Sequence, residues 1–405
     1  MARTRARLRV LHLATVPFRP EEGISRVITA LAAHMDGVDS HLAADMPTGT
    51  AFAGLHSLER WEPWPAITGR EVRRVIADLA PDVVHLHGGI LAAAIACAPA
   101  RRGVPVVATF YQLLPVPRHE LGIRQLGDAR RSSLRPGRIA ASALIGAPLA
   151  RRLLARGTIA AVCTPDPRVA SLLAPYGPVV AVRGGASLSP LRAQWSTQPT
   201  VAFAGRAEPG RGVEELIAAV ELLHEEMPAL RLRLLLLPGP AAQRWRVAYA
   251  RHPQIELSIG VRPDLQAELA NFQLVALPFR IPATITPPLV AAEAMAVGVP
   301  VVATRLSCIT PLVRSGVNGM LTRSCSPHEL AAAIRSALAD RQSWERLSEG
   351  ARRTIETDWS WSSAAVATQQ AYDIALARDP GRSRSTTRRS SGRRAVTADA
   401  GGRSV

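Results

Sequence analysis

The sequence predicts an α/β protein with two Rossmann-like domains, each built on a parallel sheet, and a cleft between them. Its length of 405 residues exceeds what one hydrophobic core usually serves, so about two domains are expected. Short apolar strands alternate with helices along most of the chain, a pattern typical of parallel sheets with helices on both faces. A polar, proline-containing segment at residues 189–199 interrupts this alternation, and we interpret it as the interdomain linker.

The same pattern sets the expected domain limits. We place an N-terminal Rossmann-like domain at residues 1–190 and a C-terminal Rossmann-like domain at residues 191–355. Residues 356–378 read as an aromatic-led helix that, in proteins of this architecture, crosses back onto the first domain. Residues 379–405 are rich in Gly, Arg, Ser and Thr and hold too few apolar side chains to build a core, so we expect them to be disordered.

The first half opens with a strand at residues 7–16 and a helix in which Val27, Leu31 and Met35 recur at helical spacing. Gly23 lies at the turn between them. A missing Cβ at such a turn lets a ligand approach backbone N–H groups, although most glycines in this position only shape the turn. Gly23 is therefore a candidate ligand-binding residue.

A helix at residues 71–80 precedes a buried strand at residues 82–89, which contains His85 and His87. The two histidines alternate along the strand, so both face the same side of the sheet. Ligands bind at the carboxyl ends of strands in open α/β sheets, which favours His87 as a catalytic candidate. A histidine satisfied inside the core is the alternative, and the pattern alone leaves both readings open.

The rest of the first half is rich in arginine. A helix at residues 91–101 leads to a strand at residues 104–109, which Tyr111 follows. Residues 115–157 hold many Arg and Pro residues. Within them, an apolar helix that ends in basic residues is expected at residues 139–154. That helix could line an acceptor cleft, lie on an anionic membrane or present a solvated basic face. Two short strands are expected at residues 160–164 and 179–182.

The second half repeats the strand–helix pattern. Six strands are expected, at residues 201–204, 232–237, 255–258, 273–277, 300–303 and 319–321. A glycine-containing loop with Gly205, Arg206 and Arg211 follows the first of them. Glycines let the backbone approach a ligand, while the helix N-terminus and two cations would offset the charge of a diphosphate. The loop predicts a diphosphate clamp, although Arg–Gly loops are common in so Arg-rich a chain.

Residues 277–304 read as a loop, a helix, a tight turn and a buried strand. Pro287 and Pro288 suit a helix start, with Thr286 as the expected N-cap. The short apolar helix that follows carries one acid, Glu293. A carboxylate in an apolar setting is costly unless something hydrogen-bonds it. Either the dipole of the first helical turn stabilises Glu293 or the acid holds a ligand.

The charge of the chain is +17, and every basic residue is Arg. Residues 377–405 contain eight Arg and two Asp. Such a surplus suits an anionic ligand, nucleic acid or an acidic membrane surface, and a compositional bias towards Arg explains it equally well. We keep peripheral contact with an anionic membrane as a candidate, and we do not expect nucleic acid as the partner.

Cysteine usage and hydropathy indicate in which cellular compartment the protein is expected. The four cysteines are scattered, with no CxxC pair and no cluster of histidines at ligand spacing, so free thiols are expected and neither a metal nor another cofactor is. No run approaches the ~18 apolar residues that span a bilayer. The N-terminus is basic and then apolar like a signal peptide, but the apolar part is short, so we expect a first strand and a cytoplasmic protein.

Three motifs resemble those of one family. EAMA-x-G-x-PVVAT surrounds Glu293, GR-x₄-RG contains Arg206 and Arg211, and VRSGVNGML covers residues 313–321. Together they resemble the retaining glycosyltransferases with the two-domain GT-B fold, family 4 type, also called glycosyl transferases group 1. The resemblance spans about residues 8–375. Arg211 stands where the family has Lys, and it keeps the charge.

The resemblance implies a hexosyltransferase that uses a nucleotide-diphosphate sugar as donor. Glu293 would hold the ribose hydroxyls, and Arg206 and Arg211 the diphosphate. The helix-start amides of Leu289 and Val290 would bind the distal phosphate. The acceptor, of unknown class, would enter from the first domain near Gly23 and His87, and no metal is implied because cations stabilise the leaving group.

The chain departs from the family pattern at several positions. Ile285 stands at the first acid of the donor motif, and Pro287-Pro288 remove two backbone N–H donors. Pro311 replaces a glutamate, Glu22 replaces one of two adjacent glycines, and Tyr111 replaces a histidine. The changes at Ile285, Pro287-Pro288 and Pro311 suggest an unusual donor sugar or lost catalysis, while Glu22 could obstruct a phosphate or place an acid towards an acceptor hydroxyl. The alternative function is a non-catalytic relative that binds a sugar nucleotide and regulates an active partner.

Other chemistries have no support. The chain has no dinucleotide-binding fingerprint, no P-loop lysine motif and no GxSxG nucleophile. Hydride transfer, NTP hydrolysis and acyl-ester hydrolysis are therefore not expected.

Overall fold

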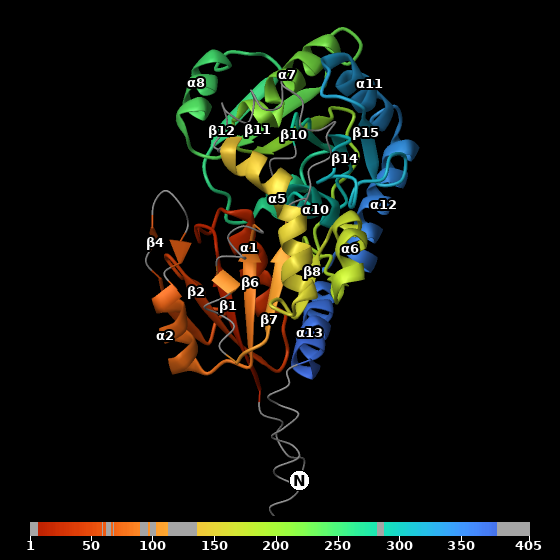
Figure 1. The fold of residues 1–405 in the computed structure, drawn as a ribbon. Helices are drawn as coiled ribbons and strands as arrows, with labels where there is room; N and C mark the ends of the chain where they lie inside the picture. Colours follow the sequence, from red (N-terminus) through yellow and green to blue (C-terminus); the bar gives the residue numbers. More distant parts are fainter. Residues whose placement is uncertain are drawn as a thin grey trace, which may run out of the picture.

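A computed structural model describes residues 7–58, 60–61, 66–67, 69–89, 96–97, 103–111, 136–281 and 287–378. Several features predicted from the sequence lie outside these residues: most of the helix at residues 91–101, the arginines at residues 118–135, Thr286, Ile285 and the tail at residues 379–405. The described chain forms two lobes, drawn in red to yellow and in green to blue (Figure 1), each around its own parallel sheet.

The first lobe contains a seven-stranded parallel sheet. Its strands run in the order β3 (Gly54–Ser57), β2 (Val38–Ala44), β1 (Leu8–Ala14), β6 (Val83–Gly88), β7 (Val106–Phe110), β8 (Ala161–Thr164) and β9 (Val179–Ala181). The central strands β6, β7 and β8 are buried at every residue, as expected when helices cover both faces of a parallel sheet. The strands β2 and β3 were not predicted from the sequence.

Helices of the first lobe connect these strands. They are α1 (Gly23–Ala33), α2 (Gly69–Leu79), α5 (Pro136–Ala155), α6 (Pro167–Leu173) and a 3₁₀ turn at Ala174–Tyr176. A small antiparallel pair joins β4 (Arg60–Trp61) to β5 (Ala66–Ile67). None of the helices in the described part of the chain has the length and hydrophobicity required to cross a bilayer.

The second lobe contains a six-stranded parallel sheet. Its order is β12 (Ile255–Ile259), β11 (Arg231–Leu236), β10 (Thr200–Gly205), β13 (Leu274–Leu277), β14 (Val301–Thr304) and β15 (Gly319–Thr322). The helices are α7 (Val213–Leu222), α8 (Pro240–Ala248), α9 (Leu265–Leu269), α10 (Leu289–Ala296), α11 (Pro327–Ala337) and α12 (Arg341–Asp358). The two Rossmann-like halves predicted from the sequence are confirmed, and all six predicted strands of this lobe are present.

The last helix, α13 (Trp361–Ala377), leaves the second lobe and packs on the first sheet. It contacts β6, β7, β8, β9 and α1, and it lies beside the lower sheet in Figure 1. The Ser360 side chain caps its N-terminus by accepting from the Ser363 amide. Asp358, which the sequence suggested as part of this segment, instead ends α12. The exact domain limits remain a prediction.

The helix that carries Glu293 begins directly after the two prolines, as the sequence suggested, but its N-cap is not Thr286. Pro288 occupies the N-cap position and Leu289 is the first helical residue. Proline suits this place because the amides of the first helical turn have no partner within the helix.

Candidate active site between the lobes

A cleft of about 520 Å³ lies between the two lobes. The first lobe contributes Pro20, Glu21 and Arg26, and the second lobe contributes the rest of the lining. The strand order of the second sheet reverses between β10 and β13, and the loops after these two strands reach the cleft. Ligands of open α/β sheets bind at such a reversal point, next to the carboxyl ends of the strands.

Most of the predicted ligand-binding residues meet in this cleft. Six of them line it: Gly205, Arg206, Arg211, Leu289, Val290 and Glu293. Gly23, the first residue of α1, and His87 are not among the lining residues. That these six residues bind a donor stays a prediction, but the fold brings together segments that are about 80 residues apart in the chain.

The loop after β10 takes its shape from Gly212, whose φ of +66° lies in the left-handed region. A Cβ there would lie 1.8 Å from the carbonyl oxygen of Pro278, so only glycine fits. The loop holds the Arg211 guanidinium 4.8 Å above the Phe279 ring. Burial lowers the pKa of Arg211 from its ordinary value and Glu208 opposes this shift. Arginine stays protonated under such conditions, so Arg211 supplies a fixed positive charge.

Glu293 lies in the second turn of α10, whose first turn contains no acid. The reading in which the helix dipole stabilises this acid is therefore wrong, since the effect falls off within the first turn. Arg26 of α1 instead pairs with both carboxylate oxygens, with Nη1 3.4 Å from Oε2 and Nη2 against Oε1. Burial raises the pKa of Glu293, and the Arg26 guanidinium counteracts this shift.

A second ion pair joins the two lobes. The Arg206 guanidinium Nη2 lies 2.5 Å from the Glu22 carboxylate Oε1. Both side chains are partly exposed, with 38% and 41% of their surface accessible. The sequence singled out Glu22 as a departure from the family pattern, but it did not predict either cross-lobe pair.

His87 lies inside the sheet and does not reach the cleft. It is fully buried, and its ring nitrogens contact the hydroxyl of Tyr111 at 2.7 Å and Nδ1 of His12 at 3.0 Å. The other nitrogen of His12 lies 3.3 Å from the Ser40 hydroxyl. With Tyr111 donating to His87, His87 can donate to His12 and His12 to Ser40, so one set of tautomers satisfies the chain. Burial holds the pKa of His87 well below its ordinary value.

His85 completes a buried histidine cluster. Its nitrogens lie 2.8 Å from the Tyr372 hydroxyl of α13 and 2.6 Å from the Thr109 hydroxyl. Potential ligand atoms of His12, His85 and His87 all lie within 4.8 Å of one another, which is close enough for a metal to be considered. Every ring nitrogen already has a hydrogen-bond partner, however, so a network of neutral imidazoles accounts for the cluster.

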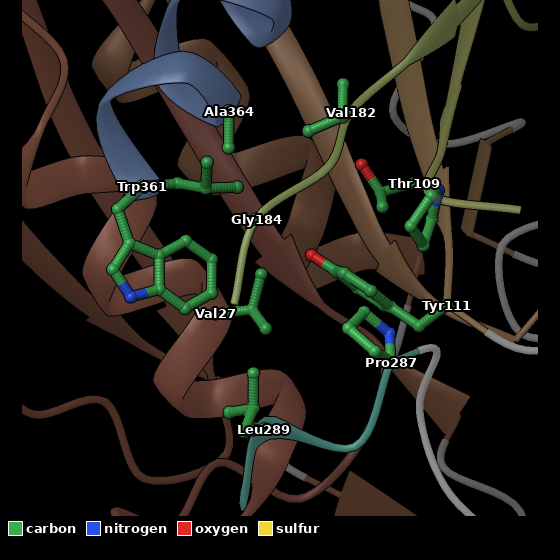
Figure 2. A pocket seen from close by; sticks show the side chains of 11 residues that line it. Val27, Thr109, Tyr111, Val182, Gly184, Pro287, Leu289, Trp361 and Ala364 are labelled. Atoms are coloured by element: carbon green, nitrogen blue, oxygen red, sulfur yellow. The ribbon is translucent and has the colours of Figure 1, made fainter. Parts of the chain in front are cut away.

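A small cavity lies between the histidine cluster and the cleft. Figure 2 shows side chains of α1, the end of β7, the segment before α10, and α13 converging on it, among them Val27, Tyr111, Leu289 and Trp361. Its volume of about 20 Å³ admits about one water molecule and not a sugar. Tyr111 is buried here, and burial raises the pKa of its hydroxyl well above the ordinary value. The cavity therefore marks a packed joint between the lobes.

Sequence reasoning missed Arg26 and the loop after β12, where Val261, Arg262 and Pro263 line the cleft. The position of this loop at the carboxyl end of a strand beside the predicted clamp was the available signal.

Comparison with known proteins supports the architecture. Residues 2–184 match the model of the Glycosyl transferase 4-like domain, and residues 198–340 match the model of Glycosyl transferases group 1. A D-inositol 3-phosphate glycosyltransferase of Corynebacterium glutamicum is 32% identical over 186 residues, which is 44% of either chain. A glycogen synthase of Mycobacterium tuberculosis is 31% identical over 180 residues, 42% of this chain and 41% of that one. The chain thus aligns with less than half the length of these curated relatives.

Solved structures show the same fold. A sucrose-phosphate synthase from Thermosynechococcus elongatus superposes with a TM-score of 0.70 at 16% identity, covering 92% of this chain and 100% of that chain. The HepE protein of Anabaena, solved with UDP-glucose, has a TM-score of 0.65 at 17% identity and covers 91% and 100%. With one family model matching each half and this two-lobe fold, the chain belongs to the group 1 glycosyltransferases of the family 4 type, with the GT-B fold.

Proposed function

We propose that the chain is a hexosyltransferase that moves a sugar from a nucleotide-diphosphate sugar to an acceptor hydroxyl with retention of configuration. The observation that carries the proposal is the meeting of Arg206, Arg211 and Glu293 in one cleft between the lobes. The printed names of the relatives, which include glycosyltransferases and a protein solved with UDP-glucose, support the same class of donor.

The donor would lie along the second lobe. Arg206 and Arg211 face its diphosphate, and the backbone amides of Leu289 and Val290 at the start of α10 donate hydrogen bonds to the distal phosphate. Glu293 accepts hydrogen bonds from the ribose hydroxyls. Apolar side chains such as Val261 line the same cleft and suit the face of a base.

In this proposal the bond between the anomeric carbon and the phosphate oxygen breaks as the bond to the acceptor oxygen forms on the same face. The proton of the acceptor hydroxyl passes to the leaving phosphate. Arg206 and Arg211 stabilise the charge that develops on that phosphate, in the place that a metal ion takes in other transferases. The acceptor approaches from the first lobe, next to Gly23 and the start of α1.

His87 enters the proposal in a supporting role. Because it is buried, it acts on the site only through the Tyr111 hydroxyl that it orients. Tyr111 lines the small cavity together with Leu289, and Leu289 also lines the cleft.

The decisive test is a panel of UDP-, GDP- and dTDP-sugars, with transfer and hydrolysis followed by mass spectrometry. We expect turnover with one nucleotide class, and a loss of at least about 100-fold on changing Arg211→Gln, since charge-stabilising donors contribute that much. Arg335→Gln is the matched control, because Arg335 pairs with Glu226 away from the cleft. Absence of turnover together with absence of a thermal shift by any nucleoside diphosphate would reject the proposal.

A non-catalytic relative is the second candidate function. Ile285 at the position of the first motif acid and the two prolines that follow favour it. This reading expects tight nucleotide binding without turnover, and no gain of turnover from Ile285→Glu. Turnover by the wild-type chain would exclude it.

We also propose a cytoplasmic location with peripheral contact at the inner face of an anionic membrane, on the strength of the basic residues 377–405. Removal of residues 379–405 should abolish a salt-sensitive association with vesicles that contain anionic lipid. Equal association of the full and shortened chains would contradict the proposal.

A further inference from the structure

An acid of the first lobe pairs with a cation that lines the proposed donor cleft. Glu22 belongs to the first lobe, and its carboxylate lies 2.5 Å from the guanidinium of Arg206 in the second lobe. Arg206 is one of the two cations that line the cleft beside the glycine loop. The carboxylate therefore contacts a cation that the donor diphosphate would need.

The local role of Glu22 does not explain this placement. Glu22 is the N-cap residue of α1, but its side chain makes no capping hydrogen bond. Glu22 and Arg26 stand four residues apart, a spacing at which an acid and a base on one helix commonly pair with each other. Instead Glu22 pairs with Arg206 and Arg26 pairs with Glu293, so both charges are directed across the cleft.

We propose that the Glu22 carboxylate competes with the phosphate of the donor for the guanidinium of Arg206. A carboxylate and a phosphate both accept hydrogen bonds from a guanidinium, so one can replace the other. The first turn of α1 then imitates the donor, with Glu22 in place of the phosphate and Arg26 in place of the ribose hydroxyls on Glu293. This inference rests on the proposed function.

Donor binding thus exchanges two ion pairs for contacts with the ligand. The phosphate replaces Glu22 as the partner of Arg206, and the ribose replaces Arg26 as the partner of Glu293. Ligands without phosphate do not compete with Glu22 for Arg206, so the acid weakens the binding of ligands that carry phosphate and leaves the binding of nucleosides unchanged. The cost of the exchange is modest, because partly exposed ion pairs are weak.

The test compares Glu22→Gln with the wild-type full chain by calorimetry. The probes are UDP, GDP, dTDP, inorganic pyrophosphate and the corresponding nucleosides. We expect Glu22→Gln to tighten binding of diphosphates and pyrophosphate by about three- to tenfold, since it removes a weak ion pair and a nearby like charge. Nucleoside affinity should stay within about twofold.

Glu21→Gln is the matched control, because Glu21 is the neighbouring acid and lines the cleft but has no ion pair among the described residues. It removes the same charge one residue away, and its effect should be clearly smaller. Thermal unfolding verifies that both variants fold.

The outcomes separate this inference from the proposed function. If the wild type binds a nucleoside diphosphate and Glu22→Gln binds it no more tightly, Glu22 is not a competitor and the proposed function stands. An equal gain for nucleosides, or an equal effect of Glu21→Gln, also overturns the inference. If no form of the chain binds any diphosphate, the proposed function itself fails.

Discussion

At the scale of the residue, Gly212 determines the shape of the cation loop in the cleft. Its backbone is left-handed, and the carbonyl oxygen of Pro278 occupies the place where a Cβ would be. Gly37 has a similar φ of +69° but open space around it. Comparing substitutions at these two glycines therefore distinguishes the cost of backbone strain from the cost of steric overlap.

Gly212→Ala should abolish detectable nucleoside diphosphate binding and lower the free energy of unfolding by about 2–4 kcal/mol, because strain and overlap add. Gly37→Ala should cost about 1–2 kcal/mol from backbone strain alone and leave binding intact. Urea unfolding and calorimetry measure the two effects. An equal loss of stability in both variants would show that the contact with Pro278 is irrelevant.

Glu293 predicts a pH dependence of stability at the same scale. Burial raises its pKa above the ordinary value of 4.5, so the folded chain binds this proton more tightly than the unfolded chain. Its contribution to stability is therefore complete below pH 4.5 and is lost as pH rises through the raised pKa.

Glu293→Gln lacks this titration. We therefore compare the free energy of unfolding of the variant with that of the wild type. The difference, variant minus wild type, should increase between pH 4.5 and pH 7, whatever its value at pH 4.5. The loss of the partner for Arg26 adds a constant, since arginine does not titrate in this range. Urea unfolding at a series of pH values measures the difference, and a flat profile would contradict the buried, proton-binding carboxyl.

At the scale of the element, α13 is attached to the first sheet through a polar contact inside an apolar interface. Tyr372 is fully buried, and its hydroxyl lies 2.8 Å from Nδ1 of His85 on β6. Burial lowers the pKa of His85, so the ring is neutral. In the tautomer with its proton on Nε2, Nδ1 accepts from Tyr372 and Nε2 donates to the Thr109 hydroxyl. The contact links α13 to β6, the strand next to β1.

Tyr372→Phe should lower the free energy of unfolding by about 1–3 kcal/mol, because it leaves a buried nitrogen without a donor. Tyr176→Phe is the control: Tyr176 is exposed, and its contact with Arg151 uses the ring and not the hydroxyl. Chemical unfolding of both variants measures the difference. Equal stabilities would mean that water replaces the Tyr372 hydroxyl at no cost.

At the scale of the whole molecule, the lobes are joined by an apolar cluster as well as by ion pairs. Leu289 of the second lobe packs with Val27, Tyr111 and Trp361 around the small cavity shown in Figure 2. Apolar burial does not depend on salt, whereas partly exposed ion pairs are weak and screened. The cluster should therefore contribute most of the stability of this joint.

Leu289→Ala should lower the free energy of unfolding by about 2–5 kcal/mol, because it enlarges an existing cavity in a packed interface. Glu22→Gln should change it by less than about 1 kcal/mol. Unfolding in urea at low and high salt compares them. A larger effect for the charge variant would place the stability of the joint in the ion pairs.

The sequence predicted much of the fold because its signals are local. The apolar runs of β10 to β15 were recognised from their period and the glycines and prolines between them. The loop of Arg206 and Arg211 was recognised for the same reason, since two cations beside a strand end and a helix start require only short spacing. The strand β2 was missed, and so was its short neighbour β3.

What the sequence by itself determined, then, is the alternation of strands and helices, the cation loop and the acid of α10. Only the tertiary structure decided that Arg26 meets Glu293, 267 residues away, that Glu22 meets Arg206, and that His87 lies among buried partners. The physical reason is that local periodicity and backbone conformation act over a few residues. Contacts across the cleft, in contrast, depend on how two complete sheets are oriented, which no short stretch of sequence specifies.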